Sequence, residues 1–166
     1  MAEMLQRFRE AQDRPHAGFQ AALRELQAGR KTGHWIWYIF PQLAGLGRST
    51  TAVHYGLAGA EEAAAYLRDA VLGERLTAAA AAVASHLGDT AHPVPLATVM
   101  GAEIDALKLV SSMTLFRHVA RALHAADPQP RFATLAGHAD AILAAAARQG
   151  YPPCAYTEAE LRGRRA

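Results

Sequence analysis

Two groups of polar side chains, far apart in the chain, flank aromatic residues and could together bind a ligand. The first group surrounds the run His34–Gln42, which contains both tryptophans of the protein, and the second lies between Asp105 and Thr114. Aromatic faces allow stacking, Lys and Arg supply positive charge, and N–H groups at helix starts favour anions. This combination is typical of a site for a small anionic ligand such as a nucleotide or sugar phosphate. The candidate binding residues are Lys31, His34, Trp37, Gln42, Arg48, Ser49, Asp105, Lys108, Ser111, Ser112 and Thr114.

A structural role for the aromatic run is the alternative interpretation. Trp35, Trp37 and Phe40 would then be core anchors, and the charged residues around them would be solvated. An exposed part of the same run could also dock a partner protein or a second copy of the chain, as a non-catalytic interaction module. Ligand binding requires the charged residues of both groups to converge in space, whereas docking requires exposed aromatics without that convergence.

The spacing of reactive residues does not support three familiar kinds of catalytic site. Lys108 and Ser111 lie three residues apart, but an activated serine also needs a desolvated lysine and oxyanion donors, and Ser111 could simply begin a helix. The eight histidines include no His-Glu-x-x-His motif and no pair four residues apart. The turn at residues 45–50 lacks the Gly-Lys-Ser/Thr ending of a P-loop. We expect no metal site and no cofactor.

Helical spacing of apolar residues predicts most of the elements that position these groups. Steps of three and four predict helices over about residues 4–12, 16–28, 60–68, 71–86, 103–125 and 131–149. The first two should form an antiparallel pair, Ser111-Ser112 could interrupt the fifth, and the stripe that includes Ile104 and Leu107 should be buried. One of the residues Ser49, Thr50 and Thr51 can cap a further helix to about residue 57.

The aromatic run itself fits either a strand or a helix. Trp35, Trp37 and Ile39 alternate, but Trp35 and Ile39 also stand at positions i and i+4. We favour a short helix that ends before Pro41, because a proline disfavours the helical conformation of the residue that precedes it. Trp35 and Ile39 should be buried, while His34 and Gln42 should face a groove.

Length and composition favour one all-α domain of about six to eight helices over residues 1–166, with a flexible tail over 158–166. No segment approaches the roughly 20 continuous apolar residues of a membrane helix, and the N-terminus lacks the apolar core of a signal peptide. We expect a cytoplasmic protein that does not associate with membranes. The single cysteine, Cys154, excludes an internal disulfide, and a net charge of +2 does not indicate nucleic-acid binding.

Sequence motifs over nearly the whole chain resemble a bacterial family, domain-of-unknown-function family eighteen-ten, whose members are often labelled calpastatin. The motifs are Arg7-Phe8, Ala11-Gln12, Ala22, Glu25-Leu26, Gly29-Arg30-Lys31, His34-Trp35, Trp37, Ile39-Phe40-Pro41-Gln42, Gly45-Leu46-Gly47, Ser49, Tyr66-Leu67, Leu72-Gly73, Arg75-Leu76, Asp105, Lys108 and Ser111–Phe116. The resemblance implies a small helical protein without an established activity. The calpastatin label does not suit these helical stripes, because the eukaryotic inhibitor of that name is a disordered repeat protein.

The chain departs from the family pattern at two places. Met100-Gly101 stands where the family usually has Phe-Gly, and Cys154 stands where an Asp is common. A weaker similarity concerns proteins that act on ADP-ribose linkages, which also combine an alanine-rich helical body with a late helix that contains Met. It implies the same class of ligand as the aromatic and basic residues do. A homo-oligomer remains a further expectation of the docking interpretation.

Overall fold

The computed structural model describes residues 1–163, which form ten α-helices, one 3-10 helix and no strand. The all-α prediction is therefore confirmed. The two helices that the sequence analysis does not predict are α7, which has only five residues, and α10 near the C-terminus. The helices are α1 (Ala2–Gln12), α2 (Phe19–Gln27), α3 (Ile36–Ile39), α4 (Thr50–Tyr55), α5 (Ala60–Arg68), α6 (Ala70–Ser85), α7 (Leu96–Met100), α8 (Glu103–Ala126), α9 (Pro130–Arg148) and α10 (Ala155–Gly163).

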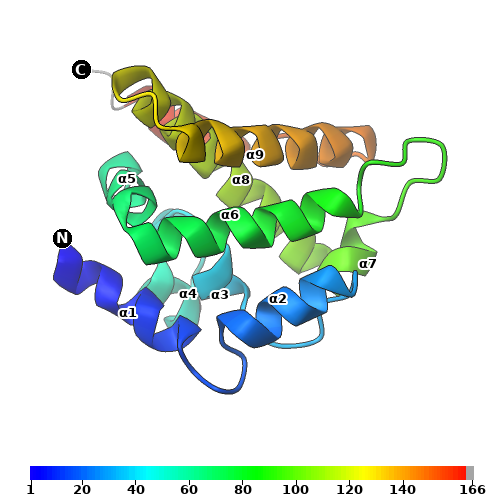
Figure 1. Cartoon of the computed structure of the whole chain (residues 1–166), viewed down its shortest axis with the longest axis horizontal. Coiled ribbons are helices and arrows are strands. Elements are labelled where there is room, and N and C mark those ends of the chain that lie inside the picture. Colours follow the sequence, from blue (N-terminus) through cyan, green and yellow to red (C-terminus); the bar gives the residue numbers. More distant parts are fainter. Residues whose placement is uncertain (164–166) are drawn as a thin grey trace.

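The three longest helices are α6, α8 and α9, and α9 lies along the upper edge of the molecule in Figure 1. Helix α9 packs along both α8 and α6, α5 and α7 pack on α8, and α10 packs on α8 near the C-terminus. Helices α1 to α4 lie on the side of α6 that is opposite α9 (Figure 1). The sequence analysis expected α1 and α2 to pack against each other as an antiparallel pair. This expectation is wrong, because α1 packs mainly on α3 and α2 packs mainly on α6.

Helix α8 runs without interruption through Ser111 and Ser112, so the expected break is absent. The predicted burial of Ile104 and Leu107 is wrong: these side chains are 62% and 49% exposed. The buried face of the first turns instead begins with Ala106, which is fully buried. The contacts of Asp105 with Lys31 and of Lys108 with Trp37 lie at this end of α8, but they leave the side chains of Ile104 and Leu107 in contact with water.

The aromatic run forms the short helix α3, as the i, i+4 spacing predicts. The helix ends at Ile39, and Phe40, which precedes Pro41, has a non-helical backbone with φ −123° and ψ 75°. Trp35, Ile39 and Phe40 are at most 2% exposed, so the predicted burial of Trp35 and Ile39 is confirmed. Trp37 is the one aromatic side chain of the run that is only partly buried. The run is therefore mainly a core element with one ring at the surface.

The chain after Pro41 is held by an isolated parallel bridge between Leu43 and Leu57. The N–H of Leu57 donates to the carbonyl of Gln42, and the N–H of Ala44 donates to the carbonyl of Leu57, each at 2.9 Å. Ser49 accepts from the N–H of Ala52 at 3.1 Å and so caps α4, in agreement with the expected cap. The bridge thus fixes the turn at residues 43–47 against the start of α5.

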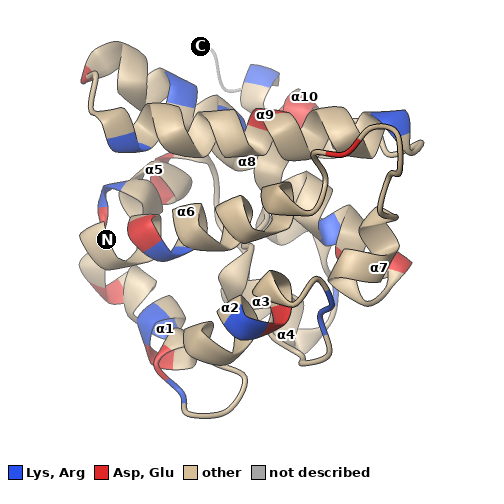
Figure 2. Cartoon of the chain, turned by 45° about the vertical axis from the view of Figure 1, so that its right-hand side comes forward, with Lys and Arg blue, Asp and Glu red and all other residues tan. Residues whose placement is uncertain are grey.

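Charged residues of both signs are distributed along the helices and do not gather into one basic stripe on the side shown in Figure 2. No helix within residues 1–163 is both long and apolar enough to cross a membrane. Residues 158–163 of the expected tail lie in α10, and residues 164–166 lie outside the described part of the chain.

Candidate functional site

Glu25 on α2 organises the loop that leads into the aromatic run. One carboxylate oxygen accepts hydrogen bonds from the N–H of Thr32 at 2.5 Å, the hydroxyl of Thr32 at 3.1 Å, the N–H of Gly33 at 2.6 Å and the indole N–H of Trp35 at 3.3 Å. Partial burial alone would raise the pKa of Glu25, but these hydrogen bonds lower it overall. The sequence analysis did not select Glu25, although it is one of the family motif residues.

Lys31 comes from the same loop and is almost completely buried, with a side chain that is 5% exposed. Its ammonium group forms an ion pair with Asp105 on α8 at 2.8 Å, donates to the carbonyl of Gly33, and lies 4.8 Å from the centre of the Trp35 ring. This pair joins the two groups of candidate residues in space. A buried cation with these three partners has a structural role, because its charge is already compensated.

The main chain of Lys31 is also fixed, through the end of α7. Its N–H donates to the carbonyl of Val99 at 2.8 Å. Gly101 ends α7 in the left-handed conformation with φ +80°, and a Cβ atom there would lie 2.4 Å from the carbonyl oxygen of Lys31. Only glycine allows both the backbone conformation and this close approach.

Lys108, one turn after Asp105 on α8, is the second cation of the cluster. Its ammonium group is 4.0 Å from Asp105 and 5.0 Å from the centre of the Trp37 ring, and its side chain is 21% exposed. Asp105 thus faces two ammonium groups and binds Lys31 more closely. The cluster carries one positive charge in excess, and Lys108 presents it to solvent.

Trp37 and Lys108 border a small crevice, with a volume of about 10 Å³, between α3, α4 and α8. The indole N–H of Trp37 is buried and has no hydrogen-bond acceptor within the described residues. A space of this volume holds about one water molecule. A heterocyclic ring cannot enter it, so the crevice can accept only a single atom or the tip of a ligand. The lining residues are Ile36, Trp37, Phe40, Gln42, Ala52, Tyr55, Gly56 and Lys108.

Three of the candidate residues are exposed at the surface. His34 and Arg48 are exposed, and Ser49 is exposed and serves as the cap of α4. Within residues 1–163, no ion pair or side-chain hydrogen bond joins any of them to Lys31, Asp105 or Lys108. The structure therefore brings together Lys31, Trp37, Gln42, Asp105 and Lys108, and does not add His34, Arg48 and Ser49 to them.

The candidate hydroxyl groups of α8 turn towards the C-terminal segment or into the core. Ser111 donates to the carbonyl of Leu107 at 3.0 Å, and Thr114 donates to the carbonyl of Val110 at 2.7 Å. The hydroxyl of Ser112 is buried and has no partner among the described groups. Because Lys108 points to Trp37 while Ser111 is bound to its own helix, the two do not form a Ser–Lys nucleophile.

Cys154 precedes α10 and is fixed to α8 by its N–H, which donates to the hydroxyl of Thr114 at 3.1 Å. Burial alone would raise the pKa of the Cys154 thiol. The polar groups around the sulfur, which are the N–H groups of Thr157 and Tyr156 and the nearby hydroxyls of Thr157 and Ser111, lower the pKa overall. The thiol therefore lies at the start of α10, and it ionises more readily than a free cysteine.

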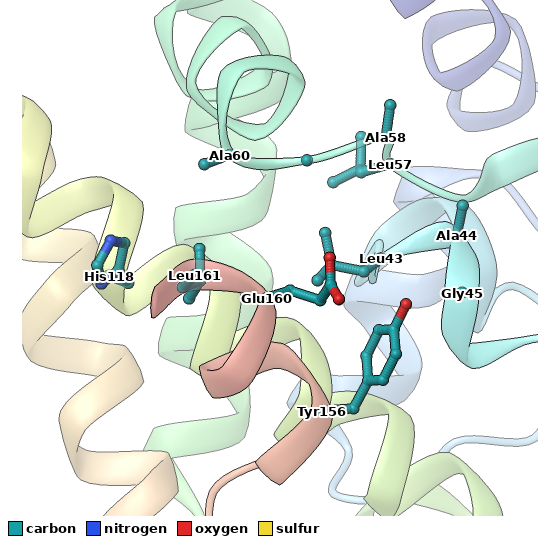
Figure 3. A pocket seen from close by; sticks show the side chains of 11 residues that line it. Leu43, Ala44, Gly45, Leu57, Ala58, Ala60, His118, Tyr156, Glu160 and Leu161 are labelled. Atoms are coloured by element: carbon teal, nitrogen blue, oxygen red, sulfur yellow. The ribbon is translucent and has the colours of Figure 1, made fainter. Parts of the chain in front are cut away.

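A larger pocket, which the sequence analysis did not predict, lies between α10, the turn after the aromatic run and the start of α5 (Figure 3). Its volume is about 260 Å³. Within residues 1–163, no group of three His, Cys, Asp or Glu side chains has the arrangement of a metal site. The pocket is lined by Leu43, Ala44, Gly45, Leu57, Ala58, Gly59, Ala60, His118, Tyr156, Glu160 and Leu161.

Comparisons with known proteins agree with the resemblance. Residues 2–133 match the family described as "Protein of unknown function (DUF1810)". The crystal structure of the conserved hypothetical protein Rv1873 from Mycobacterium tuberculosis is similar, with 36% sequence identity and a TM-score of 0.68 over 93% of this chain and 94% of that chain. No curated protein matches the sequence. The chain belongs to the DUF1810 family of proteins of unknown function.

Proposed function

We propose that the protein binds a small oxyanion, or the anionic group of a small metabolite, at the site formed by Trp37, Gln42 and Lys108. The observation that carries the proposal is the indole N–H of Trp37, which is buried without an acceptor beside an ammonium group. Buried donors are nearly always paired in native proteins, so an unpaired one indicates an acceptor that residues 1–163 do not supply. An oxygen atom of a phosphate, sulfate or carboxylate group is such an acceptor.

The charge of the site supports an anion. Asp105 is neutralised by Lys31 at 2.8 Å, which leaves Lys108 with a longer and weaker contact of 4.0 Å. An anion at the edge of the Trp37 ring, in the plane of the indole, could accept a hydrogen bond from the indole N–H and interact with the ammonium group of Lys108. The amide of Gln42, on the wall of the same crevice, provides a further donor.

The volume of the crevice limits the ligand. One oxygen atom fits into about 10 Å³, and the remainder of the ligand must stay outside. Stacking of a nucleotide base inside the site is therefore not part of the proposal. A sugar phosphate or a nucleotide would bind through its phosphate group, with the sugar or base at the surface.

The experiment is a thermal-shift screen of phosphate, sulfate, short carboxylates, sugar phosphates, nucleotides and ADP-ribose at constant ionic strength. A ligand at 100 times its dissociation constant adds about 2.7 kcal/mol to stability, which is a clear shift. We expect Lys108→Met and Trp37→Phe to abolish the shift. Arg48→Met is the matched control, because Arg48 is an exposed cation outside the cluster. The absence of a shift with any anion, or an unchanged shift in Lys108→Met, would contradict the proposal.

A second candidate function is docking of a partner protein or a second copy of the chain. Ile104 and Leu107 are exposed on the same end of α8 that carries Lys108, although both are apolar. Exposed apolar residues that lie together are a feature of interaction sites. The docking surface would then be on α8, because Trp37 is the one aromatic ring of the run that is not fully buried. Sedimentation of the wild type and of Leu107→Lys over a range of concentrations tests self-association through this surface. The wild type should associate at high concentration, and Leu107→Lys should remain monomeric.

A further inference from the structure

The pocket beside α10 differs in chemistry from the site at Trp37. Its floor is apolar, with Leu43 and Leu57 held together by the parallel bridge and Leu161 facing them from α10. Figure 3 shows the carboxylate of Glu160 and the hydroxyl of Tyr156 pointing into the space between α10 and the turn. Two polar groups above an apolar floor are the usual composition of a small-molecule site.

Glu160 gives the pocket a negative charge. It is the one Asp, Glu, Lys or Arg among the residues that line the pocket, and within residues 1–163 it forms no ion pair. His118, the other titratable side chain on the wall besides Tyr156, has an interaction partner of its own. The positive end of α5 begins at the wall, but Glu61 and Glu62 in its first turn offset it.

Tyr156 supplies an aromatic wall whose position is determined by Gly45. The hydroxyl oxygen of Tyr156 packs so closely on this glycine that a Cβ atom at residue 45 would lie 1.9 Å from it. The contact holds the Tyr156 ring across the gap between α10 and the turn. An aromatic ring next to a carboxylate is a favourable environment for an organic cation, because both the ring face and the charge attract it.

We infer that this pocket binds a small organic cation that carries a primary or quaternary ammonium group, with the charge between Glu160 and the Tyr156 ring and the alkyl part on Leu43 and Leu57. A volume of about 260 Å³ is below the usual range for drug-sized ligands, so the ligand is small. The pocket and the Trp37 site use different residues and opposite charges. Either binding proposal can therefore be disproved without affecting the other.

The experiment is titration of the full chain with tetramethylammonium chloride and n-butylammonium chloride, followed by calorimetry, with sodium chloride at equal ionic strength as the reference. We expect saturable binding of at least one ammonium ion by the wild type, and an affinity at least tenfold lower in Glu160→Gln. Glu158→Gln is the matched control, because Glu158 lies on the same helix but pairs with Arg162 and does not line the pocket.

A second variant tests the aromatic wall. In Gly45→Ala the new methyl group must displace Tyr156, and we expect weaker ammonium binding, whereas Gly137→Ala, with no atom near its added Cβ, should bind as the wild type does. Circular dichroism of each variant shows whether it is folded. The inference is overturned if the wild type binds neither ammonium ion more strongly than sodium, or if folded Glu160→Gln binds as tightly as Glu158→Gln.

Discussion

Replacement of Glu25 by Gln should destabilise the protein by about 1–2 kcal/mol, because one carboxylate oxygen holds the loop that positions Lys31 and Trp35. Hydrogen bonds to a charged acceptor contribute about 1.5–3 kcal/mol, against about 0.5–1.5 for a neutral pair. The two short backbone bonds, from Thr32 at 2.5 Å and Gly33 at 2.6 Å, should therefore each lose about 1 kcal/mol. Water competes at this partly exposed position, so their sum is an upper value.

Urea unfolding at neutral pH measures this effect, with Glu74→Gln as the control. Glu74 is exposed on α6, and its side chain forms no hydrogen bond or ion pair within residues 1–163. Its replacement should therefore change stability by less than about 0.5 kcal/mol. Glu25→Ala should cost more than Glu25→Gln, since it leaves the indole N–H of the buried Trp35 without an acceptor. If Glu25→Gln is no less stable than the control, the proposed role of Glu25 is wrong.

The pH dependence of the stability difference between the wild type and Glu25→Gln gives a second test. Hydrogen bonding lowers the pKa of Glu25 in the folded state relative to the unfolded chain. The stabilisation is therefore complete above the pKa of an unfolded Glu, about 4.3, and is lost as the pH falls through the lower folded value. The stability gap between wild type and Glu25→Gln should narrow below about pH 4. A gap that widens at low pH would contradict this reasoning.

Three further predictions concern other parts of the structure. Gly101→Ala should lose about 2 kcal/mol or more in urea unfolding, since it combines a positive φ with a clash against the carbonyl of Lys31. Gly88→Ala is the control, because its added Cβ meets no atom, and equal stabilities of the two variants would refute this account. Ser112→Ala should be as stable as the wild type within about 0.5 kcal/mol, because the buried hydroxyl of Ser112 has no hydrogen-bond partner within residues 1–163, and a cost above about 1 kcal/mol would reveal a partner. The alkylation rate of Cys154 by iodoacetamide should reach half its maximum at a lower pH in the folded protein than in urea, because the polar groups around the sulfur lower the pKa of the thiol. A higher or equal midpoint pH in the folded protein would contradict that cause.

The long helices could be predicted from the sequence because each buries a stripe of apolar residues over several turns. Helix α7 has too few residues to show such a period, and α10 follows a segment rich in proline. Ile104 and Leu107 show the limit of the method. Their spacing fits a buried stripe, but burial also needs a neighbouring element that covers the same face of the helix. The side chains of Ile104 and Leu107 have no such cover within residues 1–163 and stay exposed.

The candidate site could be predicted only in part. Residue types suggested that Lys31 and Lys108 lie near the tryptophans, and the structure places both ammonium groups over indole rings. The role of Glu25 depends on four donors that meet only in the folded loop, and the pocket beside α10 is assembled from separate segments. Spacing within the sequence contains no signal for either, because both arise from tertiary contacts.

The most direct test of the proposed anion site is a phosphate titration followed by NMR of the tryptophan indole N–H groups. The chain has two tryptophans, and Trp37→Phe assigns their signals. The N–H of Trp35 is bound to Glu25 and serves as an internal reference, whereas that of Trp37 has no acceptor in the described chain. We predict a saturable shift of the Trp37 signal alone, which Lys108→Met abolishes. A Trp37 signal that stays unchanged, or that moves together with Trp35 without saturation, would contradict the proposed function.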